Sequence, residues 1–421
     1  MQNLVAILGI PAFIGLAWLL SLRRTAFPWR TVVAGLALQG CFALVILRTE
    51  AGLWVFAWTQ RAFNRLLGFA GEGARMVFGP LADGESLGGA FGPTQVHIVA
   101  VMVTATIIVV AALSALLYHW GWLQRVVAMA AWVMRRLMRT SGSESLAAAA
   151  NIFVGQAEAP LVVRPYLRGM TRSELLSLMT GGMATIAGGV GAVYVTLGVQ
   201  AGEANMAGHL LTASVMSAPA ALLVAKVMLP EIEASETSEG AELATGREAA
   251  NSIDALCRGA GEGMKLSLNV LAMLIAFVAI VALANFLFGL AQRPLGVVQP
   301  VTLQQVLGWL NAPLAWLMGV PWKDCVTVGS VLGERVILNE FVGYTTLAAQ
   351  RPEIEPRSFV IATYALCGFA NFGSVAIQIG GIGALIPERR GELAALGLRA
   401  MVGGVLASYL TAAMAGLLLG G

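Results

Sequence analysis

The chain has 421 residues, of which 58% are hydrophobic and only 12% are charged, and its mean hydropathy is +0.78. Soluble domains carry about 25% charged residues, so this composition excludes an ordinary soluble protein and indicates a polytopic membrane protein. The net charge of +3 does not favour a nucleic-acid partner. Its four cysteines are scattered through apolar segments and show neither a disulfide framework nor the spacing of a metal site.

Apolar segments long enough to cross a bilayer recur along the chain, since a crossing helix needs about 20 residues. We expect an all-α fold with eight such spans, the first of them a transmembrane helix because it lacks the basic leader of a cleaved signal. The expected spans are residues 4–22, 31–47, 96–118, 173–198, 209–229, 264–290, 358–386 and 393–419.

Three further segments, 51–78, 120–139 and 302–318, combine apolar and aromatic residues in a way typical of helices lying along the interface. The acidic stretch 230–246 is expected to be a solvated loop. With eight spans, most arginine-rich loops fall on one side, which the positive-inside rule makes cytoplasmic, and both termini then face outward.

The stretch from Asn151 to Arg172 has two apolar limbs of about ten residues, each too short to cross a bilayer. The residues Gly155-Gln156-Ala157-Glu158 interrupt it, and basic residues lie at both ends. This pattern predicts a re-entrant hairpin that returns to the side it came from. Exposed backbone at membrane depth is tolerated only inside protein or beside a watery cavity, so the tip is expected to line a binding site.

A second re-entrant hairpin is expected over residues 323–347, interrupted at 338–341, and each hairpin precedes a span that contains a break. The first such span is expected to break at Gly181-Gly182 and again at 187–189, and the second at 368–374. From Glu158 to Gly188 is 30 residues, and from Glu340 to Asn371 is 31. An inverted repeat with discontinuous helices is typical of secondary transporters. The alternative is that these glycines are ordinary small-residue packing contacts.

A carboxylate at mid-depth costs ~2.5–3.5 kcal/mol or more, so Glu158 and Glu340 need partners. Half-helix N-termini would supply N–H groups, and their C-termini would supply carbonyls. These groups suit a neutral ligand with hydroxyls and amides better than an ion alone. Phe341, Phe369 and Phe372 would form an apolar wall or simply pack. The neutral polar residues beside the carboxylates are Gln156, Asn339, Asn371 and Ser374.

Several motifs resemble those of the concentrative nucleoside transporter family, in its bacterial sodium-coupled form, and the resemblance spans nearly the whole chain. The motifs are GQAEAPLVVRPYL at 155–167, MTRSEL at 170–175, GGMATIAG at 181–188, LNEFV at 338–342 and ATYALCGFAN at 362–371.

The resemblance implies eight transmembrane helices and two opposed hairpins in a homotrimer, with a transport domain that moves like an elevator past a scaffold. Residues 1–140 would be largely scaffold. Residues 141–229 and 323–421 would be the two repeats of the transport domain. Residues 230–322 would hold a cytoplasmic loop, a scaffold helix and a connecting helix.

The resemblance also implies site residues. Gln156 and Glu158 would bind the nucleobase, with Ala157 between them. The ribose would be bound by Glu340, Asn371 and Ser374, and the base would pack against Phe369 and Val190. A sodium ion would lie among Asn151, Val154, Thr185 and Ile186.

For two of these residues, Ala157 and Thr185, the side-chain chemistry leaves the assigned role open. The family usually has a hydroxyl residue where Ala157 stands, so the preferred base is left open. The Thr185 hydroxyl has an alternative role, since a threonine in a helix commonly bonds back to its own backbone.

The function expected is sodium-coupled import of nucleosides such as uridine, by a multi-pass protein of the bacterial inner membrane. A proton-coupled importer, in which Glu158 or Glu340 titrates, is the first alternative. A membrane enzyme acting on a nucleoside or lipid would need a nucleophile–base pair or a metal cluster, and the sequence offers neither. A channel would need a ring-forming pore motif, which is also missing from the sequence.

Overall fold

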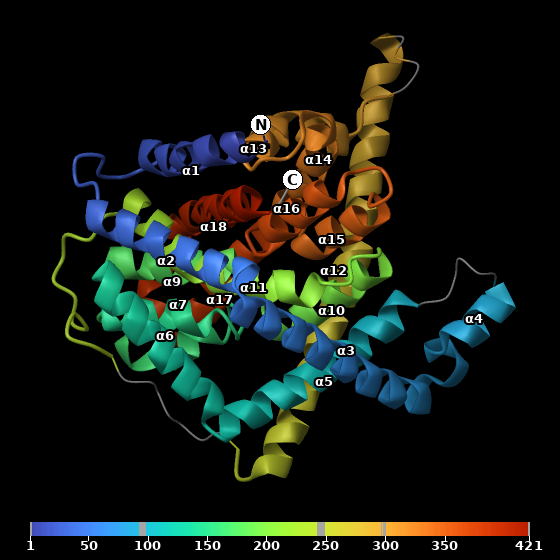
Figure 1. The fold of residues 1–421 in the computed structure, drawn as a ribbon, viewed down its shortest axis with the longest axis horizontal. Helices are drawn as coiled ribbons and strands as arrows, with labels where there is room; N and C mark the ends of the chain where they lie inside the picture. The colour runs from blue at the N-terminus through green and yellow to red at the C-terminus, as the bar shows by residue number, and fades with distance from the viewer. Residues whose placement is uncertain (1, 92–97, 242–248, 296, 298–299, 420–421) are drawn as a thin grey trace.

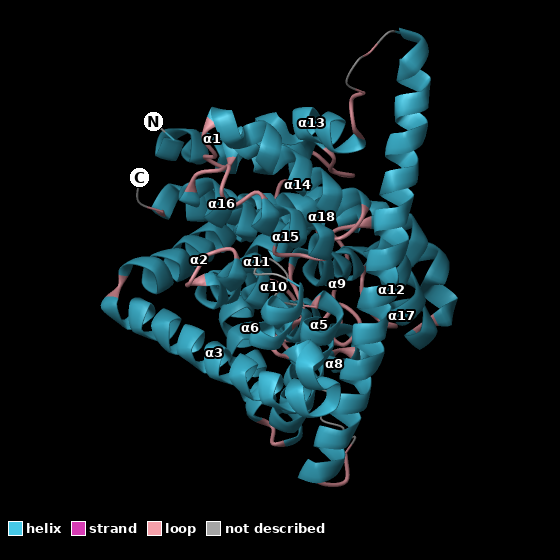
Figure 2. Cartoon of the chain, turned by 90° about the vertical axis from the view of Figure 1, so that its right-hand side faces the viewer, coloured by secondary structure: helices cyan, strands magenta, loops and turns pink. Residues whose placement is uncertain are grey.

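The computed structural model describes residues 2–91, 98–241, 249–295, 297 and 300–419. Throughout these residues the chain is helical and contains no strand, which confirms the expected all-α class. Figure 1 shows α12 as a rod at the margin of the molecule that extends beyond the other helices at both ends. The ends of the chain lie near each other, beside α1 and α13 (Figures 1 and 2).

The helices before the first hairpin include one short element, α4, and five longer ones. They are α1 (Gln2–Leu19), α2 (Trp29–Arg48), α3 (Glu50–Phe78), α4 (Gly84–Phe91), α5 (Val99–His119) and α6 (Trp122–Met138). From the first hairpin to α12 the helices are α7 (Gly142–Ala150), α8 (Ala159–Val162), α9 (Arg172–Ala184), α10 (Gly188–Gln200), α11 (Met206–Met228) and α12 (Ser252–Gln292). The last are α13 (Leu303–Leu317), α14 (Cys325–Ile337), α15 (Glu340–Ala349), α16 (Pro356–Leu366), α17 (Phe372–Leu385) and α18 (Arg390–Leu418).

Six helical segments of the described chain are long and apolar enough to cross a membrane. They coincide with α1, α2, α5, the pair α9 and α10, α11, and α18. The other two expected spans correspond to the long α12 and to the pair α16 and α17. The first two residues of the expected span 96–118, residues 96 and 97, lie outside the described residues.

The order of hairpin, broken helix and whole helix is present twice, as the sequence predicts. In the first set, α7 and α8 flank the hairpin tip, α9 and α10 are separated at residues 185–187, and α11 follows. In the second set, α14 and α15 form the hairpin, α16 and α17 are separated at residues 367–371, and α18 follows. Helix α18 packs along both α9 and α16, and α11 also contacts both, so the two sets interlock.

The expected break at Gly181-Gly182 is wrong, because both glycines lie inside α9. Their role is close packing, the alternative reading of such glycines. A Cβ at Gly182 would lie 2.9 Å from the Gln156 Cβ and 2.7 Å from the Gln378 Nε2. The break comes after Ala184, where Thr185 adopts an extended backbone, and it spans residues 185–187. It overlaps the second expected break, 187–189, only at Ala187, because Gly188 and Gly189 begin α10.

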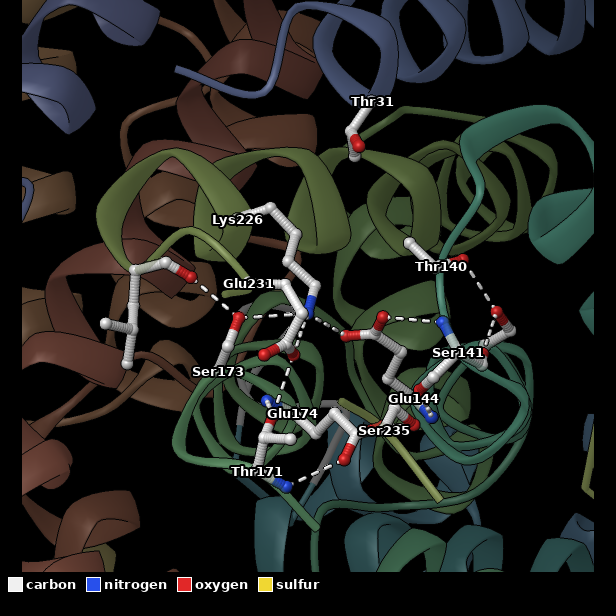
Figure 3. Close-up of polar contacts among 12 residues, drawn as sticks. Thr31, Thr140, Ser141, Glu144, Thr171, Ser173, Glu174, Lys226, Glu231 and Ser235 are labelled. Atoms are coloured by element: carbon white, nitrogen blue, oxygen red, sulfur yellow. Dashed lines mark hydrogen bonds and ion pairs between the residues drawn. The ribbon is translucent and has the colours of Figure 1, made fainter. Parts of the chain in front are cut away.

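The acidic stretch is not simply a solvated loop, because residues 230–241 dock on the roots of α7 and α9 (Figure 3). Lys226 at the end of α11 lies 2.8 Å from Glu144 and 3.1 Å from Glu231, and its Nζ donates to the Ser173 hydroxyl at 2.9 Å. The Gly142 N–H donates to the Thr237 carbonyl at 2.7 Å. The remainder of this stretch, 242–246, lies outside the described residues.

This network makes Lys226 a testable anchor of the first hairpin. Lys226→Met leaves Glu144, whose side chain is only 2% exposed, without its cation, and such a change costs ~3–5 kcal/mol. We expect a clear fall in the thermal unfolding temperature of the detergent-solubilised protein. Lys323→Met is the matched control, since Lys323 pairs with Glu355 at the surface and exposed pairs contribute little. Equal unfolding temperatures for the two variants would contradict the anchoring role.

Candidate functional site

A chain of hydrogen bonds joins the tips of the two hairpins. The Gln156 Nε2 donates to the Ser374 Oγ at 2.9 Å, and the Ser374 N–H donates to the Asn371 Oδ1 at 2.8 Å. The Asn371 Nδ2 then donates to the Glu340 Oε2 at 3.0 Å. Gln156 comes from the first hairpin and Glu340 from the second, so the break between α16 and α17 is the bridge between the repeats.

Glu340 is held as a buried carboxylate at the N-terminus of α15. Its side chain belongs to a residue only 6% exposed, and its Oε1 accepts a hydrogen bond from the Tyr194 hydroxyl at 2.8 Å. Asn339 is the N-cap of this helix and accepts from the Val342 N–H at 3.0 Å. A helix N-terminus favours an anion, so the cap and the helix dipole together stabilise Glu340 at this place.

The sequence analysis missed Tyr194 and Gln378. Tyr194, on α10, is fully buried and stacks on Tyr344 with ring centroids 4.2 Å apart. Gln378, on α17, donates through Nε2 to the Gln156 Oε1 and to the Met179 carbonyl, both at 3.1 Å. A signal for Gln378 exists in the sequence, since it follows Ser374 by four residues and therefore shares its helix face.

The first hairpin tip presents a more open surface. Glu158 is exposed, and its Oε2 accepts from the Gly155 N–H at 2.8 Å, which closes the turn. Ala157 is exposed beside it. Within the described chain Glu158 makes no direct bond to Glu340, so it is Gln156 that connects this tip to the second repeat.

Val190 and Phe369 lie on the two broken helices. Val190 is buried in the first turn of α10, and Phe369 is half-buried between α16 and α17. The Phe369 N–H donates to the Thr185 carbonyl at 3.3 Å, so the two breaks touch each other.

Of the four expected sodium ligands, Asn151, Val154, Thr185 and Ile186, it is Asn151 whose surroundings suit a bound cation. Asn151 is 1% exposed, and neither its Oδ1 nor its Nδ2 has a hydrogen-bond partner among the described residues. Such an orphaned buried group costs about 1–3 kcal/mol unless a ligand satisfies it. The side chain lies against Gly181, where a Cβ would come within 3.2 Å of the Nδ2.

The Thr185 Oγ1 donates to the Gly181 carbonyl at 2.9 Å, so the back-bonding alternative for this hydroxyl is right. A hydroxyl oxygen that donates its proton can still accept or ligate through its lone pairs, and a hard cation prefers such neutral oxygens. The Gly188 N–H donates to the Phe153 carbonyl at 3.3 Å, which ties the hairpin tip to the start of α10. No cluster of His, Cys, Asp and Glu suited to a metal ion occurs in the described part of the chain.

Family models match most of the chain. Residues 209–416 match the model for the C-terminus of the Na+ dependent nucleoside transporter, and residues 8–81 match the model for its N-terminus. Residues 100–201 match a gate model described as nucleoside recognition. The chain belongs to the Na+ dependent nucleoside transporter family.

Relatives agree with this membership over the full length. An uncharacterized transporter, YutK, of Bacillus subtilis is 42% identical over 419 residues, which covers 99% of this chain and 100% of that protein. Sodium/nucleoside cotransporter 1 of Mus musculus is 36% identical over 434 residues, covering 99% of this chain and 64% of the mouse protein.

Solved structures of CNTnw share the fold. The inward-facing substrate-bound state has a TM-score of 0.92 at 37% identity and covers 99% of this chain and 98% of CNTnw. A doubly substituted variant in an outward-facing state has a TM-score of 0.93, also at 37% identity with the same coverage. This member of the nucleoside transporter family is therefore an integral multi-pass membrane transporter and not an enzyme.

The Tyr194 hydroxyl gives a direct test of the Glu340 geometry. Tyr194→Phe removes a hydrogen bond to a charged group, worth about 1.5–3 kcal/mol. We expect the half-saturating uridine concentration for uptake to rise by about 10- to 100-fold. Tyr344→Phe is the matched control, because that stacked and buried tyrosine donates to the Thr363 carbonyl at 2.9 Å instead. An equal rise in both variants would count against a special role for Tyr194.

Proposed function

We propose that this chain imports nucleosides across the bacterial inner membrane, driven by the sodium gradient. Membership of the family supplies the class of ligand and the coupling ion. The observation that carries the proposal is the chain of hydrogen bonds from Gln156 to Glu340. This chain brings polar donors and acceptors of both repeats close together, beside the break between α16 and α17.

In this proposal the polar groups of the nucleoside replace some of the internal partners in that chain of hydrogen bonds. Glu340 accepts from ribose hydroxyls, while Asn371 and Ser374 complete the ribose contacts. Gln156 and Glu158 bind the edge of the base. The internal bonds of the site already pair amide donors with carboxylate and hydroxyl acceptors, so a ligand with hydroxyls and amides fits without leaving a buried group unpaired.

The base would lie against Val190 and Phe369. Ala157 offers it no hydroxyl, so base selection rests on Gln156 and Glu158. Gln156 is buried and bonded to Ser374, whereas Glu158 is exposed at the tip of the first hairpin.

Coupling follows from the orphaned amide of Asn151. A sodium ion held by the Asn151 Oδ1, the Thr185 Oγ1 and the carbonyls of Val154 and Ile186 would satisfy the oxygen of that amide. These residues belong to the first hairpin and to the break between α9 and α10. By holding the first hairpin against the break between α9 and α10, the ion would order the tip that carries Gln156. Nucleoside binding would therefore depend on the cation.

Transport would be by alternating access of the elevator type. Residues 141–229 and 323–421 would form the moving domain, with the two hairpins entering from opposite sides of the bilayer. Residues 1–140 and 230–322 would supply most of the scaffold and the contacts of a homotrimer. The matched structures of CNTnw include inward-facing, intermediate and outward-facing states, which supports this reading.

The test of the substrate site is Glu340→Gln. The variant keeps the shape of the side chain but turns one acceptor into a donor, so uridine uptake by proteoliposomes is expected to fall at least ~100-fold. Glu334→Gln is the control, since this neighbouring buried carboxylate interacts with Thr346 and Gln304 outside the site. Wild-type uptake by Glu340→Gln, in a protein with an unchanged unfolding temperature, would remove the assignment.

The test of coupling is cation replacement. Uridine uptake is expected to disappear when choline replaces sodium, and undiminished uptake at unchanged pH would reject sodium coupling.

The proposed sodium ligands have a matched pair of variants. Thr185→Ala is expected to raise the sodium concentration for half-maximal uptake by about tenfold, which is the effect of losing ~1.4 kcal/mol. Thr212→Ala is the matched control, since Thr212 is also buried and its hydroxyl donates to the Gly208 carbonyl at 2.7 Å. Because Thr212 lies on α11, outside the proposed sodium site, this variant is expected to keep the wild-type sodium dependence. Equal sodium dependence of the two variants would argue against Thr185 as a ligand.

A further inference from the structure

The side-chain amides of Gln378 and Gln156 belong to a chain of hydrogen bonds that has a direction. The Gln378 Nε2 donates to the Met179 carbonyl of α9 and to the Gln156 Oε1, both at 3.1 Å. The Gln156 Nε2 donates in turn to the Ser374 Oγ at 2.9 Å. Donation therefore runs from Gln378 through Gln156 to Ser374, beside the bonds that join the two repeats.

The backbone of α9 sets the orientation of the Gln378 amide. A carbonyl oxygen can only accept, so Gln378 has to turn its NH2 group and not its oxygen towards Met179. That group has two hydrogens, and the second one is donated to Gln156. With the amide turned the other way, the Gln378 oxygen would lie against the Met179 oxygen, and neither acceptor would have a donor between them.

Packing alone does not explain a glutamine at position 378. The residue is 2% exposed, and its Oε1 has no hydrogen-bond partner among the described residues. A buried acceptor without a partner is costly, and an apolar side chain of similar length would avoid that cost. What glutamine adds at this position is the donation to Gln156.

Gln378 thereby fixes which edge of the Gln156 amide is free. Because the Gln156 Oε1 accepts from Gln378, its NH2 group lies on the side of Ser374, and one hydrogen of that group remains after the bond to Ser374. The Ser374 hydroxyl accepts this bond, and its own proton has no acceptor within the described chain. The groups left for a ligand here are therefore N–H and O–H donors.

Glu158 supplies the opposite chemistry two residues further along the same hairpin tip. It is exposed, and of its two carboxylate oxygens only Oε2 accepts a hydrogen bond in the described structure, from the Gly155 N–H. A donor at Gln156 and an acceptor at Glu158 complement a base that has a carbonyl beside a ring N–H, which is a lactam edge. Uracil and hypoxanthine have this edge, whereas cytosine and adenine have an amino group beside a ring nitrogen that accepts.

We propose that Gln378 is a positioning residue that holds the Gln156 amide as a donor, so that the transporter selects nucleosides whose base has a lactam edge. Uridine and inosine are then preferred to cytidine and adenosine, which would leave the Gln156 N–H and the Glu158 carboxylate without matching partners. This inference rests on the proposed function, in which Gln156 and Glu158 bind the edge of the base.

The first measurement uses the wild-type protein in proteoliposomes with a sodium gradient. Unlabelled uridine and cytidine, and then inosine and adenosine, compete with the uptake of labelled uridine, and the members of each pair differ only at the edge in question. The concentration that halves uptake is expected to be at least about 10-fold lower for the lactam member of each pair. Equal values or the reverse order in either pair overturn the inference, whereas absence of any sodium-driven uptake would reject the proposed function itself.

The second measurement uses Gln378→Met, which keeps a side chain of similar length but removes the donor. The Gln156 amide can then turn either edge to the base, so the preference for uridine over cytidine is expected to fall towards equality. Gln39→Met is the matched control. Gln39 is a buried glutamine of α2 whose Nε2 donates to the Met216 carbonyl and the Thr411 hydroxyl, and whose Oε1 also has no partner in the described chain.

The ratio of the two half-saturating concentrations separates positioning from a merely structural role. Loss of packing lowers the unfolding temperature and the uptake of both nucleosides, but it does not change their ratio, so Gln39→Met is expected to keep the wild-type ratio. A wild-type ratio in Gln378→Met, or an equal change of ratio in both variants, overturns the positioning role. If Gln378→Met does not fold, Gln378→Asn decides, because its amide is one methylene too short to reach Met179 and Gln156 together. Its ratio is expected to fall, and an unchanged ratio overturns the inference.

Discussion

Interrupting a helix inside a membrane leaves backbone N–H and C=O groups where water cannot satisfy them, and this constraint governs the structure. The protein meets it by placing its interruptions against one another. The Phe369 N–H donates to the Thr185 carbonyl, and the Gly188 N–H donates to the Phe153 carbonyl. The Asn151 amide has no hydrogen-bond partner among the described residues, whereas the Glu340 carboxylate accepts from Tyr194 and Asn371. These are the polar groups that the proposed function gives to the ion and to the nucleoside.

Side chains at the interruptions serve the local backbone and the site together. Asn339 and Asn371 each cap the half-helix that they precede, by accepting from Val342 and Ser374 respectively. The cap makes the helix start there, and the start of the helix places Glu340 or Ser374 in the chain of hydrogen bonds that joins the two repeats. Gly368 allows the two breaks to approach closely, since a Cβ there would lie 2.7 Å from the Met183 carbonyl oxygen. Capping and close approach therefore determine the geometry of binding.

The base of the first hairpin is fixed by charged side chains. The buried pair Lys226 and Glu144, together with the more exposed Glu231, forms an ionic cluster that joins α11, α7 and the loop after α11. A rigid base confines motion to the tips and to the domain as a whole, which suits a transport domain that moves as one body.

The sequence by itself determined the all-α membrane class, both hairpins, the doubled order of elements and the polar residues at the breaks. These follow from local signals, namely apolar segments too short to cross a bilayer and acidic residues between them. The sequence pattern misplaced the first break at Gly181-Gly182, and it missed Tyr194, Gln378 and the docking of residues 230–241. Only the tertiary structure decided these, since glycines inside a well-packed helix and glycines at a break look alike until the neighbour is known. A buried tyrosine or glutamine likewise acquires its role from the carboxylate or amide that a distant segment brings to it.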